Sequence, residues 1–127
     1  MNAHTRRVIA RVSTETLAIG DASVSAALRL IREHGHEGLD VATLCREVGL
    51  SRSVLQRRFR ALLKRSVHQE IIAAKVRRAQ ELLVKTDLPL IVVAERAGFR
   101  YQEYMGAVFK KRLGKTPARV RAQGRHF

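Results

Sequence analysis

The stretch from Leu90 to Arg121, LIVVAERAGFRYQEYMGAVFKKRLGKTPARVR, carries the strongest structural pattern in the chain. Apolar residues at positions 90, 93, 94 and 97 recur with a helical period. Gly98 interrupts this period, as expected where a backbone must turn with positive φ. A short helix, a tight turn and a longer helix with a basic face form a helix-turn-helix unit, predicted over residues 90–113. The apolar face of its longer helix is predicted to comprise Tyr101, Tyr104, Met105, Val108, Phe109 and Leu113.

The residues that follow predict how this second helix ends. Gly114 suits the left-handed conformation that terminates helices. Thr116 and Pro117 suit the start of another helix, as N-cap and first helical residue. The residues after Arg121 are predicted to form only a frayed end.

A second unit of the same kind is predicted over residues 40–64, with Asp40 and Ser51 as helix caps and Gly49 at the turn. Cys45, on the inward side of the shorter helix, is predicted to be a small core residue. We call residues 40–64 the first head and residues 90–113 the second head. In the longer helix of the first head, the predicted inward residues are Val54, Leu55, Phe59 and either Leu62 or Leu63.

The two heads align as an internal repeat. Gly49 corresponds to Gly98 and, after one extra residue in the second turn, Phe59 corresponds to Phe109. A repeated unit of this kind is hard to obtain by accident, so the pattern predicts two reading heads. Lys64 stands where the second head is followed by Gly114, which predicts a first recognition helix that runs on or ends less sharply.

Residues 68–86, HQEIIAAKVRRAQELLVKT, predict one continuous linker helix between the heads. About nineteen residues at roughly 1.5 Å each span about 28 Å. Successive major grooves on one face of DNA lie roughly 34 Å apart, so this helix is expected to let one chain cover two adjacent grooves. Residues 21–34 predict a further scaffold helix, with Asp21 or Ser23 as N-cap and Gly35 as its stop.

Several residues in the second head resemble a known family. The residues Gly98-Phe99, Tyr104, Phe109-Lys110-Lys111, Gly114 to Pro117 and Arg121 resemble the second helix-turn-helix of the arabinose-operon regulator (AraC/XylS) family. Met105 and Val120 depart from the family, which usually has Phe and Tyr there, but both remain apolar. The resemblance implies an all-α domain of about seven helices over residues 21–127, with two helix-turn-helix subdomains joined by a linker helix.

The first twenty residues do not resemble the start of a domain. One interpretation is a disordered tail or an artificial extension. The other is that residues 11–21 resemble the junction of xylose-operon-type regulators, where a sugar-sensing domain precedes the DNA-binding domain. This resemblance implies that residues 1–20 are a linker from an upstream sensor domain, which would bind an effector such as a sugar.

Charge and composition restrict the function classes. The net charge is +14: residues 1–40 hold five arginines and five acidic residues, whereas residues 41–127 hold twenty Lys or Arg and six acidic residues. Such an excess favours a polyanionic partner. A single cysteine, no export signal and no membrane-spanning run favour a cytoplasmic protein without disulfides. We find no pattern for catalysis, no metal-ligand spacing and no cofactor-binding motif, so no enzyme is expected.

Each predicted recognition helix offers side chains that suit base edges. Gln pairs with adenine, Arg with guanine, and Glu accepts from cytosine. Ser53, Gln56 and Arg57 also match positions where the family reads bases. Gly106 and Ala107 are small where family members often carry a longer reader, so the second head is expected to read less sequence directly. The predicted base-reading residues are Arg52, Ser53, Gln56 and Arg57 in the first head and Gln102 and Glu103 in the second.

Phosphate contacts require cations and helix N-termini and carry affinity without sequence information. Arg78, in the linker helix, is predicted to bind either phosphate or a core carboxylate. The predicted phosphate-binding residues are Ser51, Arg58, Arg60, Lys64, Arg65, Lys110, Lys111, Arg112, Lys115 and Thr116.

These features together predict sequence-specific binding of duplex DNA by a bacterial transcription regulator, with RNA polymerase as a further partner implied by the resemblance. Two alternatives share the basic charge. A non-specific architectural DNA coat would have no need of Ser53 and Gln56. An RNA or ribosomal-surface protein would be expected to expose more aromatic side chains for base stacking.

Overall fold

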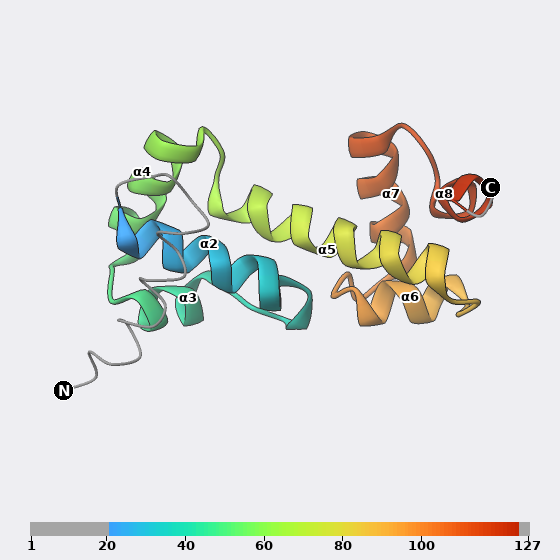
Figure 1. Ribbon diagram of the computed structural model, residues 1–127, viewed down its shortest axis with the longest axis horizontal. Coiled ribbons are helices and arrows are strands. Elements are labelled where there is room, and N and C mark those ends of the chain that lie inside the picture. The colour runs from blue at the N-terminus through green and yellow to red at the C-terminus, as the bar shows by residue number, and fades with distance from the viewer. Residues whose placement is uncertain (1–20, 125–127) are drawn as a thin grey trace. The chain divides into compact units, whose positions relative to one another are not determined.

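The computed structural model describes residues 21–124 of the chain (Figure 1). The predictions made for residues 1–20 and 125–127 lie outside the described residues. Seven α-helices and one short 3₁₀ turn make up the described part, in which no strand occurs. This confirms the predicted all-α class. Within residues 21–124, no helix is both long and apolar enough to cross a membrane.

The described residues divide into two compact units: residues 21–34 with 39–71, and residues 35–38 with 72–124. The first unit contains α2 (Ala22–His34), α3 (Val41–Val48), α4 (Arg52–Leu63) and the start of α5 (Val67–Lys85). The second contains the 3₁₀ turn η1 (Gly35–Glu37), the rest of α5, α6 (Leu90–Arg96), α7 (Gln102–Leu113) and α8 (Pro117–Gly124). The segment 35–38 therefore packs with the second unit although it precedes the first head in sequence.

The core of the first unit is formed by apolar side chains from each of its helices. Phe59 of α4 is fully buried, and truncating such an aromatic residue typically costs about 3–5 kcal/mol. Leu63 is half-buried and Leu62 is 41% exposed, which decides between the two predicted alternatives. The buried apolar residues of this unit are Val24, Ala26, Ala27, Leu28, Ile31, Leu44, Val48, Leu55, Phe59, Val67 and Ile71.

The second unit has a core of its own, built around Phe99, Met105 and Phe109. Phe99 meets Phe109 and Tyr104 edge-on, with ring centroids 6.4 and 5.7 Å apart. Figure 1 shows α7 running across the direction of α6. The helices α5, α6 and α8 supply the remaining core residues Ile72, Val76, Ala79, Leu82, Leu83, Val93, Ala94, Ala97 and Val120.

Helix starts follow the predicted capping residues. The Asp21 carboxylate accepts from the backbone amides of Ser23 and Val24 at 3.0 and 3.1 Å. Asp40 accepts from the Thr43 amide at 2.8 Å. That hydrogen bond holds the pKa of Asp40 below its usual value of 3.8. The hydroxyls of Ser51 and Thr116 accept in the same way from amides three residues further on.

Helix ends follow the predicted glycines, with one correction. Gly49 and Gly114 have φ values of 74° and 71° and end α3 and α7. The prediction that α4 runs on or ends less sharply is wrong in both forms, because α4 ends at Leu63, where Lys64 itself adopts the left-handed conformation at φ 59° and donates to the Arg60 carbonyl. A lysine there costs more than glycine would, yet α4 and α7 have the same length of twelve residues.

Two other sequence predictions need correction. Tyr101 is not on the apolar face of α7: it lies before the helix, in extended conformation, and is 62% exposed. Cys45 is half-buried rather than enclosed. The end of the chain is helical further than expected, since α8 continues to Gly124.

Candidate nucleic-acid interface

The turn of the first head is short and closed by backbone hydrogen bonds. The amides of Gly49 and Leu50 both donate to the Cys45 carbonyl, at 2.9 and 3.2 Å. Ser51 then caps α4 through the Val54 amide at 3.3 Å. These contacts place the first turn of α4 directly after the turn that follows α3.

The turn of the second head contains one more residue, and the structure shows how it is accommodated. Gly98 has a φ of 90°, and Arg100 also has a positive φ, 75°. The Phe99 amide donates to the Ala94 carbonyl, and the Tyr101 amide donates to the Phe99 carbonyl. These two successive hydrogen bonds hold the longer turn together. At Gly98, a Cβ would lie 2.6 Å from the carbonyl oxygen of His36. Glycine is therefore required both by φ and by the close approach of η1.

The predicted base-reading residues of the first head share one side of α4. Leu55 and Phe59 are buried, whereas Arg52, Ser53 and Arg57 are exposed and Gln56 is half-buried. Residues four apart lie one above the other on a helix, so positions 52 and 56, and 53 and 57, form two adjacent columns. The helix thus presents both hydrogen-bond donors and acceptors along its first two turns.

In the second head, Gln102 and Glu103 occupy the exposed first turn of α7. The next positions on that side are Gly106, half-buried, and Ala107, exposed. Lys110 follows, exposed, in the last turn. The polar groups on this side of α7 are therefore concentrated at its two ends.

The predicted phosphate contacts of the first head differ in how they are paired. Arg65 makes a 2.7 Å ion pair with Glu70, whose side chain is only 7% exposed, and Arg58 lies 3.4 Å from Asp21. Arg60 and Lys64 are exposed. Because a buried carboxylate left without its cation is strongly destabilised, Arg65 has a structural role in addition to any role in binding.

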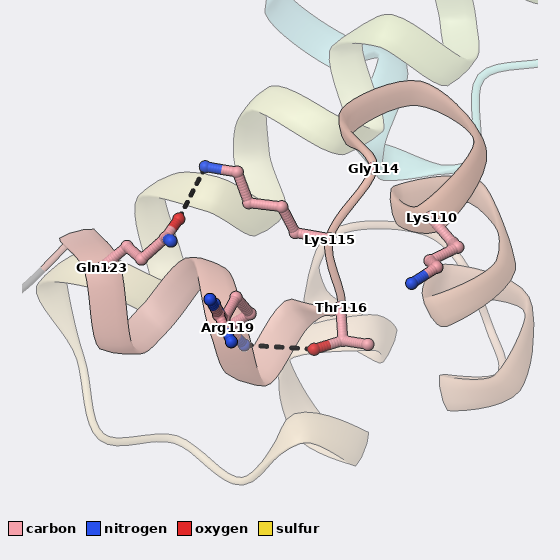
Figure 2. A pocket seen from close by; sticks show the side chains of 6 residues that line it. All are labelled: Lys110, Gly114, Lys115, Thr116, Arg119 and Gln123. Carbon is pink, nitrogen blue, oxygen red and sulfur yellow. Dashed lines mark hydrogen bonds between the residues drawn. The ribbon is translucent and has the colours of Figure 1, made fainter.

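Three cations line one pocket at the elbow between α7 and α8, where the second head ends (Figure 2). Lys110, Lys115 and Arg119 line a pocket of about 240 Å³ together with Thr116, whose hydroxyl accepts from the Arg119 amide at 3.2 Å. Lys115 Nζ donates to Gln123 Oε1 at 2.6 Å. Arg119 was not among the predicted phosphate-binding residues. Its position in the first turn of α8, three residues after the N-cap Thr116, would have indicated that it lies near the other cations. The other two predicted cations of this head, Lys111 and Arg112, are exposed on α7.

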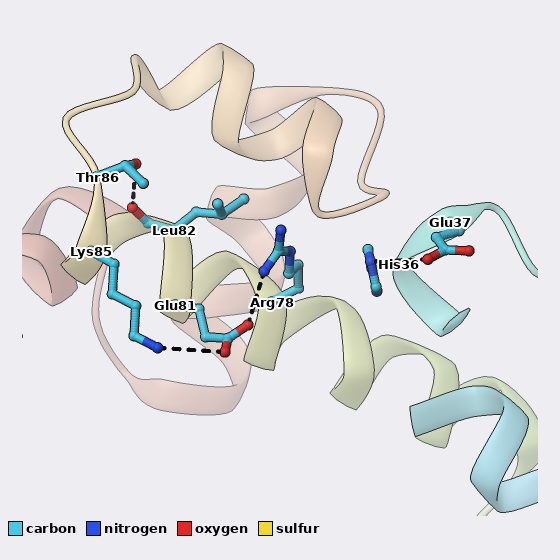
Figure 3. Close-up of polar contacts among 7 residues, drawn as sticks. All are labelled: His36, Glu37, Arg78, Glu81, Leu82, Lys85 and Thr86. Carbon is cyan, nitrogen blue, oxygen red and sulfur yellow. Dashed lines mark hydrogen bonds and ion pairs between the residues drawn. The ribbon is translucent and has the colours of Figure 1, made fainter. Parts of the chain in front are cut away.

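Two further arginines have structural partners. The Arg78 guanidinium lies 3.2 Å from Glu81, which is also 3.8 Å from Lys85 (Figure 3). Of the two predicted alternatives for Arg78, the carboxylate partner is present, although Glu81 is 51% exposed rather than in the core. Arg121 donates to the carbonyls of Leu83, Thr86 and Leu88 at 2.9, 3.2 and 2.8 Å.

No group of three or more His, Cys, Asp or Glu residues that could hold a metal ion occurs within residues 21–124. The lysines and arginines described above instead present positive charge beside the longer helix of each head. This arrangement suits a large polyanion better than a small ligand.

Comparisons with known proteins agree with this geometry. A family described as a helix-turn-helix domain matches residues 44–123. The xylose operon regulatory protein of Escherichia coli K12 is 35% identical over 115 residues, which cover 91% of this chain and 29% of the relative. The arabinose operon regulatory protein of the same strain is 34% identical over 103 residues, covering 80% of this chain and 35% of the relative.

One solved structure that is similar to this chain contains bound DNA. The DNA-binding domain of AdpA, described as a global transcriptional factor in complex with a target DNA, superposes with a TM-score of 0.74. It is 36% identical in sequence, and the match covers 80% of this chain and 92% of that domain. The chain thus spans most of a DNA-binding domain but only about a third of the two operon regulators.

Proposed function

The chain belongs to the AraC-type helix-turn-helix family, and on that premise we propose that it binds double-stranded DNA with sequence specificity, as the DNA-binding part of a bacterial transcription regulator. The observation that carries the proposal is the repeated head. Each head has a tight turn followed by a twelve-residue helix with one buried face and one exposed polar face. Such a helix fits the major groove of B-DNA.

In this proposal α4 supplies most of the base contacts. Arg52 and Arg57 bind guanine, Gln56 binds adenine, and Ser53 accepts or donates at either. On α7, Gln102 binds adenine and Glu103 accepts from cytosine. The position of these side chains in the first two turns of their helices, away from the buried faces, supports these roles.

Phosphate binding supplies most of the affinity in this proposal. The amides at Ser51 and Thr116 lie at helix N-termini, where anions are favoured. The cluster of Lys110, Lys115 and Arg119 in Figure 2 supports a phosphate position at the α7–α8 elbow. The remaining cations assigned to phosphate are Arg58, Arg60, Lys64, Arg65, Lys111 and Arg112.

The regulatory context is proposed from the relatives. Because the matched residues make up only 29% of the xylose operon regulator and 35% of the arabinose operon regulator, we expect an upstream sensor domain that binds a small effector such as a sugar. The effector would change how the sensor presents or pairs the DNA-binding domain, and the bound domain would recruit or block RNA polymerase. This role requires no catalysis, and we expect it to be carried out in the cytoplasm.

Binding-site selection from a random duplex library, at two salt concentrations, tests the proposal. We expect an enriched motif with two clusters of preferred bases about one helical turn apart. No enriched motif, with an affinity that collapses as salt rises, would instead identify a non-specific architectural coat.

Two matched variants in the first head separate the two kinds of contact. Gln56→Ala should relax the preference at one base pair and leave the salt dependence unchanged. Arg60→Ala should weaken binding to all sequences and reduce the slope of log K against log salt by about 1. Equal effects of both variants on every sequence would contradict the assignment of Gln56 to a base.

A further inference from the structure

Gly106 lies in the middle of α7, where nothing within the described residues requires a glycine. Its φ is not positive, and a Cβ built on it would meet no atom within 4 Å. Three glycines near it in the second unit have visible reasons: Gly98 and Gly114 have positive φ, and a Cβ on Gly124 would lie 2.4 Å from the Val84 side chain. The fold by itself would accept alanine at position 106.

Glycine at this position has a cost that the fold does not offset. It is the poorest helix former after proline, because it gives up the most backbone freedom on folding. A glycine inside a helix therefore calls for another reason, and close approach of a second molecule to the backbone is one that glycine serves well. Because the space around the position of its Cβ is open, a second molecule could approach the backbone there.

The surroundings of Gly106 indicate which molecule that is. Gln102, Glu103 and Lys110 lie four, three and four residues away from it, and all three are exposed on the same side of α7. Gly106 is thus at the centre of the face proposed to enter the groove.

The first head carries a different residue at the equivalent position. Gln56 directly follows the buried Leu55, as Gly106 directly follows the buried Met105, and this correspondence sets the equivalence between the two helices. The first head therefore offers a long polar side chain where the second offers bare backbone. The two heads are expected to meet the groove floor at this point with different chemistry.

We propose that Gly106 is a positioning residue that lets the α7 backbone contact a base edge, and that this edge carries the C5-methyl group of thymine. The proposal rests on the DNA-binding function proposed above. Gly106 and Ala107 offer only C–H groups between the polar ends of α7. The thymine methyl is the apolar group that the major groove presents, and small apolar residues contact it. A long polar side chain at position 106 would hold α7 away from it.

Fluorescence anisotropy with the duplex obtained by binding-site selection tests this contact. Each thymine of the second half-site is replaced in turn by deoxyuridine, which removes only the methyl group. For the wild-type protein we expect one replacement to weaken binding roughly fourfold, the value of one buried methyl. Gly106→Gln, which copies Gln56, should bind the unmodified duplex about tenfold more weakly, because its long polar side chain would hold α7 away from the methyl group, and should no longer distinguish thymine from uracil at that position.

Stability measurements keep the result interpretable. Gly106→Gln should melt at the same temperature as the wild-type protein or higher, because glutamine favours the helix more than glycine does. Ala122→Gln, which adds the same kind of side chain at an exposed position of α8, serves as the matched control and should leave DNA binding unchanged. At the position of the thymine, Gly106→Gln should favour adenine instead.

Two results would rule out the thymine contact, and a third would rule out the proposed function. If Gly106→Gln binds the selected duplex as tightly as the wild-type protein, or if no single thymine methyl affects wild-type binding, the contact does not exist. If the wild-type protein selects no sequence at all, the proposed function fails first, and that failure is distinguishable because it is observed before any variant is made.

Discussion

Replacing Arg121 by methionine should destabilise the second unit without removing a DNA contact. The guanidinium joins α8 to the end of α5 and to the loop that leads into α6, through the carbonyls of Leu83, Thr86 and Leu88. These acceptors belong to a helix end and a loop, where carbonyls lack helical partners. Methionine keeps much of the aliphatic length but none of the donors.

The size of the effect follows from the three hydrogen bonds. A hydrogen bond from a charged donor contributes about 1.5–3 kcal/mol, but the three are not additive, since the freed carbonyls regain some water. We therefore expect a loss of about 3 kcal/mol in the free energy of unfolding. For a domain of this size that corresponds to a decrease in Tm of about 15 °C. Arg121→Lys should recover only part of it, because an ammonium lacks the planar fork of donors.

Arg119→Met is the matched control, since Arg119 is an exposed arginine of the same helix. Thermal and urea unfolding followed by circular dichroism should show a change below about 0.5 kcal/mol for Arg119→Met. DNA affinity, measured well below both melting points, should fall for Arg119→Met and remain unchanged for Arg121→Met. Equal melting points for the two variants would refute the structural role of Arg121, and a loss of affinity in a fully folded Arg121→Met protein would show instead that Arg121 contacts DNA.

Four further substitutions test the helix caps and the second turn. Lys64→Gly should raise the free energy of unfolding by up to about 1 kcal/mol, because glycine adopts the left-handed conformation without strain; chemical denaturation that shows no gain would contradict this. Asp40→Ala should lose stability mainly above pH 3.8, because folding lowers the pKa of Asp40 and the stabilisation by its carboxylate disappears as the pH falls through that lower value. Urea unfolding of both proteins at several pH values measures this loss. A stability difference that persists unchanged in strong acid would be inconsistent with it. Gly98→Ala should destabilise the protein more than Gly114→Ala, because of these two positions only at Gly98 would the new Cβ lie against a backbone atom, the carbonyl oxygen of His36. The melting temperatures of the two variants give the comparison. Equal decreases in melting temperature would mean that this close approach is unimportant.

Local features of the chain could be predicted because they depend on residues close in sequence. Asp40, Ser51 and Thr116 cap their helices through amides three residues away, so the capping pattern is visible in a short window. Gly49 and Gly114 end helices for an equally local reason, their freedom to adopt positive φ. The same holds for the apolar periods that predicted two heads and a linker helix.

The pairing of charged side chains depended on the tertiary structure. Nothing in the sequence indicates that Arg58 meets Asp21, thirty-seven residues away, or that Arg121 reaches the end of α5. These contacts identify the cations that also have a structural partner, whereas the sequence ranked Arg58, Arg60 and Arg65 alike as candidates for phosphate binding.

The left-handed conformation of Lys64 and the unit to which residues 35–38 belong could also be known only from the tertiary structure. Lysine has no intrinsic preference for the left-handed conformation, so the sequence favoured a longer α4, whereas burial of Phe59 and Val67 on either side of the turn accompanies a left-handed Lys64. Likewise, residues 35–38 follow α2 in the chain but pack with the second unit. The positions of the helices, most of their caps and the repeat follow from residues close in sequence, because these are short-range properties. The long-range partners could be known only from the tertiary structure, because burial and charge pairing depend on which elements meet.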